Sequence, residues 1–237
     1  MLFLFIGIGV AVVAVAHMAP FPFLLDALHA SRVMWRMPHH DGPPTVYLTY
    51  DDGPNPAATP ALLDVLAEEQ VQATFFLIER HITEQTAPIV RRISDEGHSI
   101  ALHSHTRREM VRRPEDLADR LTRFAARVQG LTGRPPCKAF RPHAGWRSTQ
   151  MLEGLRRIDY QMIGWGFMLW DFDGFRERSV RMVPRLVRRA SPGDIVVIHD
   201  GHHVNPRADR QYAVEVTRQL IPALRQRGFQ FGRICGS

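Results

Sequence analysis

Residues Thr45 to Pro54 read Thr-Val-Tyr-Leu-Thr-Tyr-Asp-Asp-Gly-Pro, and this stretch decides the fold. Its first six residues are β-branched, aromatic or aliphatic, and their only polar side-chain groups are the hydroxyls of threonine and tyrosine. This is the composition of a strand. The aspartates Asp51 and Asp52 follow at once, and with Gly53 and Pro54 they form a turn signal that ends the strand. A polar turn placed directly after such a strand is where barrel-type α/β proteins carry their active sites.

The alternation of strand and helix continues outward from this stretch. It predicts an α/β fold in which parallel strands and crossover helices form a distorted (β/α) barrel, closed or nearly closed. The chain of 237 residues fits one such domain. The further predicted strands are Ala73 to Ile78, Ser99 to Leu102, Lys138 to Arg141, Gln161 to Gly164, Ile195 to His199 and Phe229 to Phe231. The predicted helices are Pro60 to Glu69, Pro88 to Glu96, Pro114 to Leu131, Gln150 to Arg157, Ser179 to Ala190 and Tyr212 to Arg227.

The composition excludes several classes of protein. With 45% hydrophobic and 23% charged residues the chain is neither disordered nor fibrous. The formal net charge of +6 comes from arginine, because Lys138 is the only lysine. The arginines occur in scattered pairs, which is typical of solvated helix faces, and we expect no nucleic-acid partner. Cys137 and Cys235 are too few for a disulfide framework, and they either pair or act as small core residues.

The amino terminus predicts a membrane segment over residues 1–25. Every residue from Met1 to Ala16 is apolar or glycine, and the first charged side chain is Asp26. This length approaches the hydrocarbon thickness of a bilayer, and the Ala14-Val15-Ala16 sequence leaves a cleaved signal peptide as the alternative. Residues 26–43 are a connector that could lie at the membrane interface as a short amphipathic helix. Positive charges after the segment would place the domain in the cytoplasm, although an extracytoplasmic site is expected for the reaction below.

Polar residues follow five of the predicted strands, where a barrel would bring them together. They are Asp51-Asp52, His103-Ser104-His105, Arg141-Pro142-His143, Asp171-Phe172-Asp173 and His199-Asp200. Two adjacent carboxylates are costly to ionise together unless a metal or a guanidinium compensates them. One aspartate could therefore hold a divalent metal beside a histidine, while the other accepts a proton from water.

The ordered motifs resemble the polysaccharide deacetylase family, also called the NodB-homology group or carbohydrate esterase family 4. The resemblance covers about Pro44 to Gly232, and we assign residues 44–235 to this domain. The stretch Thr49 to Pro54 is similar to the family's Thr-Phe-Asp-Asp-Gly-Pro motif. Its first aspartate is the catalytic base and its second binds the metal, which implies these roles for Asp51 and Asp52.

The remaining motifs extend the resemblance to four further residues. His103 is similar to the first histidine of the metal motif, Arg141 to the arginine that orients the base, and His199 to the general acid. Asp171 is similar to the aspartate of the Asp-Trp motif. The resemblance implies a hydrolase that removes an N-acetyl or similar small acyl group from an amino sugar of a polysaccharide or lipid-linked glycan. The implied cofactor is a divalent metal, expected to be zinc, and the implied partner is that glycan. The membrane is a further expected partner, because of the apolar segment over residues 1–25.

The sequence departs from the family at the second metal-binding histidine, where it has Arg107. A guanidinium cannot ligate a metal, so Arg107 would instead serve as a fixed positive charge near the oxyanion. His105 is the other residue that could complete a metal site, although its spacing from His103 points it elsewhere on a helix. The departure also leaves open an alternative from another class, a membrane-tethered glycan-binding pseudoenzyme with an incomplete metal site.

Overall fold

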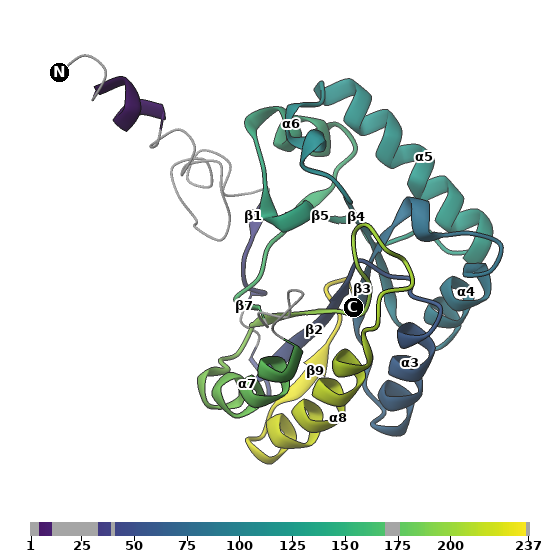
Figure 1. Ribbon diagram of the computed structural model, residues 1–237, viewed down its shortest axis with the longest axis vertical. Coiled ribbons are helices and arrows are strands. Elements are labelled where there is room, and N and C mark those ends of the chain that lie inside the picture. The colour runs from purple at the N-terminus through teal and green to yellow at the C-terminus, as the bar shows by residue number, and fades with distance from the viewer. Residues whose placement is uncertain (1–4, 11–32, 39–40, 169–175, 236–237) are drawn as a thin grey trace.

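One parallel sheet forms the centre of the computed structural model, which describes residues 5–10, 33–38, 41–168 and 176–235 (Figure 1). Its strands follow the order β1-β6-β5-β4-β3-β2-β8-β7, and β9 pairs with the start of β2. Every pair of neighbouring strands among the described residues is parallel, as the alternation predicts. The strands are β1 (Val33–Met34), β2 (Thr45–Asp51), β3 (Thr74–Ile78), β4 (Ser99–His103), β5 (Ala139–Arg141), β6 (Gln161–Ile163), β7 (Phe167–Met168), β8 (Ile195–His199) and β9 (Gln230–Gly232).

Six helices pack in a row that follows the sheet. Neighbouring helices contact one another in the order α6, α5, α4, α3, α8, α7, which matches the order of most of the strands beneath them. Such a row results when each strand crosses over through a helix to a parallel strand. The helices are α3 (Ala58–Glu68), α4 (Ala87–Asp95), α5 (Pro114–Thr132), α6 (Thr149–Arg157), α7 (Arg176–Arg189) and α8 (Gln211–Gln226). Three short 3₁₀ turns are η2 (Glu79–His81), η3 (Arg107–Val111) and η4 (His143–Gly145).

The described strands form a half-barrel, so the expectation of a barrel is confirmed only in this coarser form. β1 and β7 stand at the two ends of the run and are not paired with each other. Between these ends, an isolated antiparallel bridge joins Arg36 to Asp194, and Arg36 Nη2 donates a hydrogen bond of 2.6 Å to Asp194 Oδ1. The sheet therefore curves far enough for its carboxyl edge to surround a site.

The alternation of side chains along β2 decides which residues face that site. Val46, Leu48 and Tyr50 belong to the large core that packs beneath the helices. Tyr47 belongs to a smaller cluster on the opposite, inner face of the sheet. Because successive residues of a strand point to opposite faces, Asp51 lies on the same inner face as Tyr47.

Part of the connector predicted over residues 26–43 is a strand of the domain. Val33 and Met34 form β1 and pair with Met162 and Ile163 of β6. Trp35 follows and packs edge to face against Trp165, with ring centroids 5.7 Å apart. This strand replaces the amphipathic helix that we considered for these residues, because backbone pairing with β6 satisfies its polar groups.

The amino-terminal prediction is largely outside the described residues. Residues 5–10 form a short helix with exposed side chains, and residues 1–4 and 11–25 are not described. Within the described ranges, no helix is both long enough and apolar enough to cross a bilayer. The anchor thus stays a prediction from sequence.

A disulfide joins Cys137 to Cys235 and settles the question left open by the sequence. The bond closes a separation of 98 residues, with the two Cα atoms 5.7 Å apart. Cys137 precedes β5 and donates its backbone N–H to Ile100 O, and Cys235 follows β9. The bond therefore holds the carboxyl terminus against the amino-terminal end of the sheet, away from the edge where the strands end.

Candidate active site

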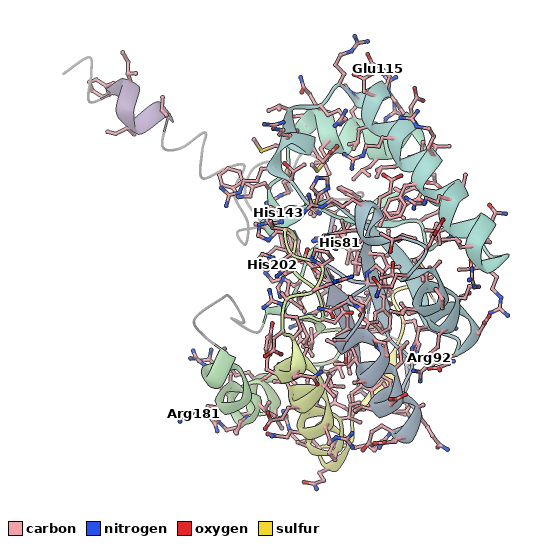
Figure 2. The ribbon with its side chains drawn as sticks, turned by 45° about the vertical axis from the view of Figure 1, so that its right-hand side comes forward. His81, Arg92, Glu115, His143, Arg181 and His202 are labelled. Carbon is pink, nitrogen blue, oxygen red and sulfur yellow. A yellow bond between two sulfur atoms is a disulfide. The ribbon has the colours of Figure 1, made fainter. Side chains whose placement is uncertain are left out.

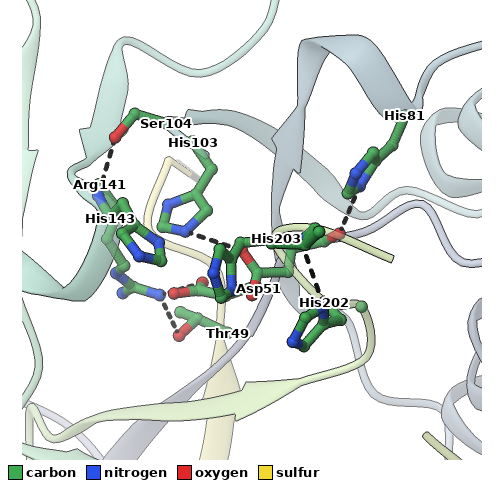
Figure 3. Close-up of polar contacts among 12 residues, drawn as sticks. Thr49, Asp51, His81, His103, Ser104, Arg141, His143, His202 and His203 are labelled. Atoms are coloured by element: carbon green, nitrogen blue, oxygen red, sulfur yellow. Dashed lines mark hydrogen bonds and ion pairs between the residues drawn. The ribbon is translucent and has the colours of Figure 1, made fainter. Parts of the chain in front are cut away.

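The register of the sheet brings the predicted site residues to one edge. Asp51 at the end of β2 is the direct register partner of His199 at the end of β8. In the same way His103 at the end of β4 is the register partner of Arg141 at the end of β5. Because all these strands are parallel, their last residues lie along the same edge of the sheet. Figure 3 shows Asp51, His103 and Arg141 gathered at this edge.

Arg141 fixes the carboxylate of Asp51. Its Nη1 atom donates to Asp51 Oδ1 at 2.6 Å and to Thr49 Oγ1 at 2.9 Å. Its other donors reach the carbonyl oxygens of Ile163 and Gly164 at 3.2 and 3.0 Å. Both members of the ion pair are buried, and burial lowers the pKa of Arg141 while the charge of Asp51 opposes that shift. Each of the three guanidinium nitrogen atoms thus donates a hydrogen bond, and the fixed guanidinium holds Asp51 in one orientation.

Asp52, His103 and His143 form a group with the spacing of metal ligands. One ligand atom from each residue lies within 4.8 Å of the others. His103 Nε2 is 3.2 Å from Asp52 Oδ1, yet this buried oxygen accepts no well-formed hydrogen bond from any residue that the structure describes. Buried polar atoms are normally paired, so a buried carboxylate oxygen without a hydrogen-bond partner beside two imidazoles is suited to binding a cation. Two imidazoles and a carboxylate are a ligand set typical of catalytic zinc sites.

Electrostatics favour the anionic form of Asp52. Burial acts to raise the pKa of this carboxyl group. The contact with His103, and the charges that His103, His199 and His143 carry when they are protonated, outweigh burial and hold its pKa well below the usual range. The carboxylate is therefore ionised at neutral pH and available to a metal.

His143 is the third member of this group, and the sequence analysis gave it no role. It opens η4 directly after β5, and its backbone N–H donates to Ser104 Oγ at 2.8 Å, which ties this turn to the residue after His103. Burial lowers the pKa of His143 to about 4, assisted by the charges of His103, His203 and Arg107. The neutral imidazole is the form that ligates metals. The signal in the sequence was its place beyond a predicted strand, in Arg141-Pro142-His143.

The loop after β2 is held in an unusual conformation that presents Asp52. The φ angle of Asp52 is 69°, in the left-handed region that most residues avoid. His81 Nδ1 donates to the carbonyl oxygen of Asp52 at 3.0 Å. On the other side Gly201 approaches so closely that a Cβ atom there would lie 2.0 Å from the same oxygen. These contacts fix the backbone that carries the carboxylate of Asp52.

Asp200 is a further buried carboxyl group behind this loop. It is fully buried, it accepts the Thr59 hydroxyl group, and a Cβ atom at Gly53 would lie 2.8 Å from Asp200 Oδ2. Burial raises its pKa to about 7, and the charges of Asp51 and Asp52 act in the same direction. Asp200 therefore supports the loop that carries Asp52. Of the pair His199-Asp200, the sequence analysis had given a role only to His199.

The residues expected to replace the second histidine of the family lie outside the group of Asp52, His103 and His143, which we call the metal group because it could hold a metal. Arg107 is exposed, and its guanidinium lies over the ring of Trp146 at 5.1 Å from the centroid. His105 lines a neighbouring pocket, together with Arg80 and Arg108. Asp171 lies outside the described residues. The structure therefore brings together Asp51, Asp52, His103, Arg141 and His199, and adds His143 to them.

Several more histidines lie near this site. The rings of His143 and His203 have centroids 4.4 Å apart, and those of His202 and His203 are 4.6 Å apart. Figure 2 shows His81, His143 and His202 grouped near one another, well separated from Arg92 and Arg181 on the helices. These imidazoles near the site can donate or accept hydrogen bonds with a polar ligand.

Comparisons with known proteins agree with the motifs. The family model for polysaccharide deacetylase matches residues 39–163. A chitooligosaccharide deacetylase from Bradyrhizobium sp. (strain ANU 289) is 31% identical over 80% of this chain and 88% of its own length. The peptidoglycan-N-acetylmuramic acid deacetylase PdaA from Bacillus subtilis (strain 168) is 28% identical over 80% of this chain and 70% of its own.

A solved structure is similar over nearly the whole chain. It is a peptidoglycan N-acetylglucosamine deacetylase in complex with 4-naphthalen-1-yl-N-oxidanyl-benzamide. The TM-score is 0.75 at 25% identity, covering 90% of this chain and 95% of the other. The half-barrel seen here is thus shared with the structure of that deacetylase.

Proposed function

Because the chain belongs to the polysaccharide deacetylase family, we propose that it is a hydrolase that removes an N-acetyl group from an amino sugar of a glycan. The observation that carries the proposal is the placement of Asp51, with Arg141 behind it, beside the group of Asp52, His103 and His143. An oriented carboxylate next to a metal-binding group is what hydrolysis of an amide requires.

We propose that the cofactor is a divalent metal, zinc being the metal that this ligand set suits best. Asp52, His103 and His143 would hold it. Once bound, the metal would supply Lewis-acid activation of water and of the amide carbonyl group. His143 thereby takes the place that the family gives to a second histidine, where this chain has Arg107.

The chain's own residues then divide the proton transfers. Asp51, oriented by Arg141, accepts a proton from the attacking water. The carbon–nitrogen bond of the amide breaks, and His199 gives a proton to the departing amine. The products are acetate and a free amino sugar, so the atoms of one water molecule are accounted for.

We also propose that the protein is membrane-associated through residues 1–25 and that its domain is extracytoplasmic. The apolar run from Met1 to Ala16 supports an anchor. The disulfide between Cys137 and Cys235 supports an oxidising compartment, because such bonds are rare in the cytosol. Protection of the domain from protease added to spheroplasts, which lack an intact outer membrane or cell wall, would instead place it on the cytoplasmic side. A substrate near the membrane, a cell-surface polysaccharide or a lipid-linked sugar, fits this location.

The test is release of acetate from N-acetylated glycans by the full-length chain supplied with zinc. We expect acetate from N-acetylchitooligosaccharides or peptidoglycan fragments with the wild-type chain, and a large loss of release with Asp51→Asn. Glycan binding without acetate from any N-acetylated substrate would overturn the proposal and support the glycan-binding alternative.

A further inference from the structure

A second pocket lies beside the candidate active site and is rich in arginine. It has a volume of about 330 Å³. The residues of this arginine pocket that matter here are Arg80, His105, Arg108, Glu109, Arg112 and Arg120. Four guanidinium groups and one carboxylate are among the lining residues, and Glu79 Oε2 lies 3.8 Å from Arg120 Nε, so positive charge remains in excess.

The single carboxylate holds two of the arginines in place. The side chain of Glu109 is 2% exposed. Arg112 Nε donates to Glu109 Oε2 at 2.7 Å, and Arg112 Nη2 is 3.3 Å from Oε1. Arg120 donates to the same Oε1 atom. A buried carboxylate shared by two guanidinium groups makes a fixed wall in place of two freely moving surface side chains.

The other two arginines have no carboxylate partner within the described ranges. Arg80 is exposed, and its Nη2 atom donates to the carbonyl oxygen of His203 and lies 3.3 Å from that of Val204. Arg108 is exposed, and no ion pair with a described residue involves its guanidinium. These donors are free of acidic groups and face the same pocket, where an anion could use them.

The arginine pocket adjoins the metal group through two short connections. His105 lines the pocket and lies only two residues after His103, so their Cα atoms are within about 7 Å. Arg80 binds the carbonyl group of His203, whose ring centroid is 4.4 Å from that of His143. Figure 3 shows His203 near His143. A ligand with its amide at the metal group could therefore extend into the pocket.

We propose that the arginine pocket binds an oxyanion, a phosphate or a carboxylate, carried by the amino-sugar substrate. This inference rests on the proposed deacetylase function and narrows its substrate class to anionic amino sugars. The planar donor fork of a guanidinium can bind two oxygen atoms of either a carboxylate or a phosphate, and such charged hydrogen bonds are about twice as strong as neutral ones. A neutral chitooligosaccharide would bind at the metal group alone and leave the pocket's charge uncompensated.

Substrates that differ only in their anion test the inference. The full-length, zinc-supplied chain is compared on N-acetylchitotriose, its 1-phosphate and its aldonic acid. We expect kcat/KM for at least one anionic sugar to exceed that for the neutral sugar by about tenfold or more, which is the effect of one charged hydrogen bond. The gain resides in KM, and it falls in high salt because Arg80 and Arg108 are exposed.

Variants of the pocket connect this preference to its residues. In Arg80→Gln combined with Arg108→Gln, we expect the anionic preference to fall to about onefold while kcat/KM for the neutral sugar is unchanged. Arg91→Gln is the matched control, because Arg91 is an exposed arginine on α4 outside the pocket. An equal preference in the double variant and in the control would overturn the inference.

A binding measurement separates failure of the pocket from failure of the proposed function. Calorimetric dissociation constants for the three sugars and for inorganic phosphate are measured on the Asp51→Asn chain, which is expected not to turn them over. Tighter binding of an anionic sugar, lost in the pocket variant, supports the inference even when no acetate is released from any sugar. Binding of inorganic phosphate as tight as that of the phosphorylated sugar would show a free-phosphate site and contradict the substrate assignment, as would equal binding of all three sugars.

Discussion

Arg141 Nη1 lies 2.6 Å from Asp51 Oδ1, and neither side chain is more than 3% exposed. The two residues come from strands that are not neighbours, since β3 and β4 lie between β2 and β5 in the sheet. The pair therefore crosses the inner face of the half-barrel, and it both orients the proposed base and joins distant strands. Removing one partner of a buried ion pair typically costs about 3–5 kcal/mol of stability.

Replacement of Asp51 by asparagine separates catalysis from metal binding. We expect Asp51→Asn to lower kcat/KM by about 10²–10⁴, the usual contribution of a general base, and to leave the zinc content unchanged. Stability also falls, because the Arg141 charge is left uncompensated. Acetate release and bound zinc are measured on the same preparation.

Asp64→Asn is the matched control, since Asp64 forms an exposed ion pair with Arg92 at 2.7 Å. Such pairs contribute about 0–1 kcal/mol, and activity should be unchanged. Turnover by Asp51→Asn within tenfold of the wild type would exclude Asp51 as the base.

The burial of His98, which lies far from the site, should make the stability of the folded chain sensitive to acid. Burial, with the charges of Arg233 and Arg92, lowers the pKa of His98 to about 4. The unfolded chain has a histidine pKa of about 6.5, so it binds more protons than the folded chain between these values. Stability is therefore lost as pH falls from about 6.5 to about 4, by up to roughly 3 kcal/mol from this residue.

The matching variant is His98→Asn, because asparagine can still accept the backbone N–H of Ala73 that His98 Nδ1 accepts at 3.1 Å. Urea unfolding at pH 7 and at about pH 4 should show a smaller difference in the variant than in the wild type. An identical pH dependence of the two chains would mean that His98 is protonated as easily in the folded state as in the unfolded one.

The disulfide should contribute to stability without contributing to turnover. It closes 98 residues of chain, for which loss of the bond costs about 2–5 kcal/mol. We expect Cys137→Ser combined with Cys235→Ser to unfold at lower urea with unchanged kcat/KM, because Cys137 lies before β5 and the site lies after it. A loss of activity in the folded variant would show that the two ends of the sheet are coupled.

Gly201 is expected to tolerate no side chain. A Cβ atom there would lie 2.0 Å from Asp52 O and 2.6 Å from Gly53 N, and backbone atoms cannot move aside cheaply. We expect Gly201→Ala to cost about 1–3 kcal/mol of stability and to weaken zinc binding at least tenfold by shifting Asp52. Gly130→Ala on α5 is the control, since no atom lies within 4 Å of its added Cβ and alanine favours helices by up to about 1 kcal/mol. Unchanged zinc binding in Gly201→Ala would show that this contact does not position Asp52.

Much of the fold was predictable because it depends on local pattern. The strand and turn from Thr45 to Pro54 and the helix over Pro114–Thr132 follow from residue type and periodicity. The two-residue strands β1 and β7 were not predicted, because two residues carry no period. Their pairing is decided by the neighbouring strands β6 and β8.

The site was predictable only as far as its motifs extend. Strand ends brought Asp51, His103, Arg141 and His199 to one edge, as the sequence predicts for parallel strands. The role of His143 could not be assigned, since its approach to Asp52 depends on the turn of η4 and on the Ser104 hydrogen bond. Arg107 was identified by its position in a motif, whereas its contact with Trp146 is a tertiary feature.

The metal content of four purified full-length chains tests the central claim most directly: the wild type, His143→Ala, Arg107→Ala and His105→Ala, each equilibrated with zinc and freed of excess. We expect about one zinc per chain in the wild type, in Arg107→Ala and in His105→Ala, and a loss of zinc in His143→Ala, with all four chains folded by circular dichroism. Zinc retained in full by His143→Ala, or absent from the wild type, would contradict a metal site built from Asp52, His103 and His143.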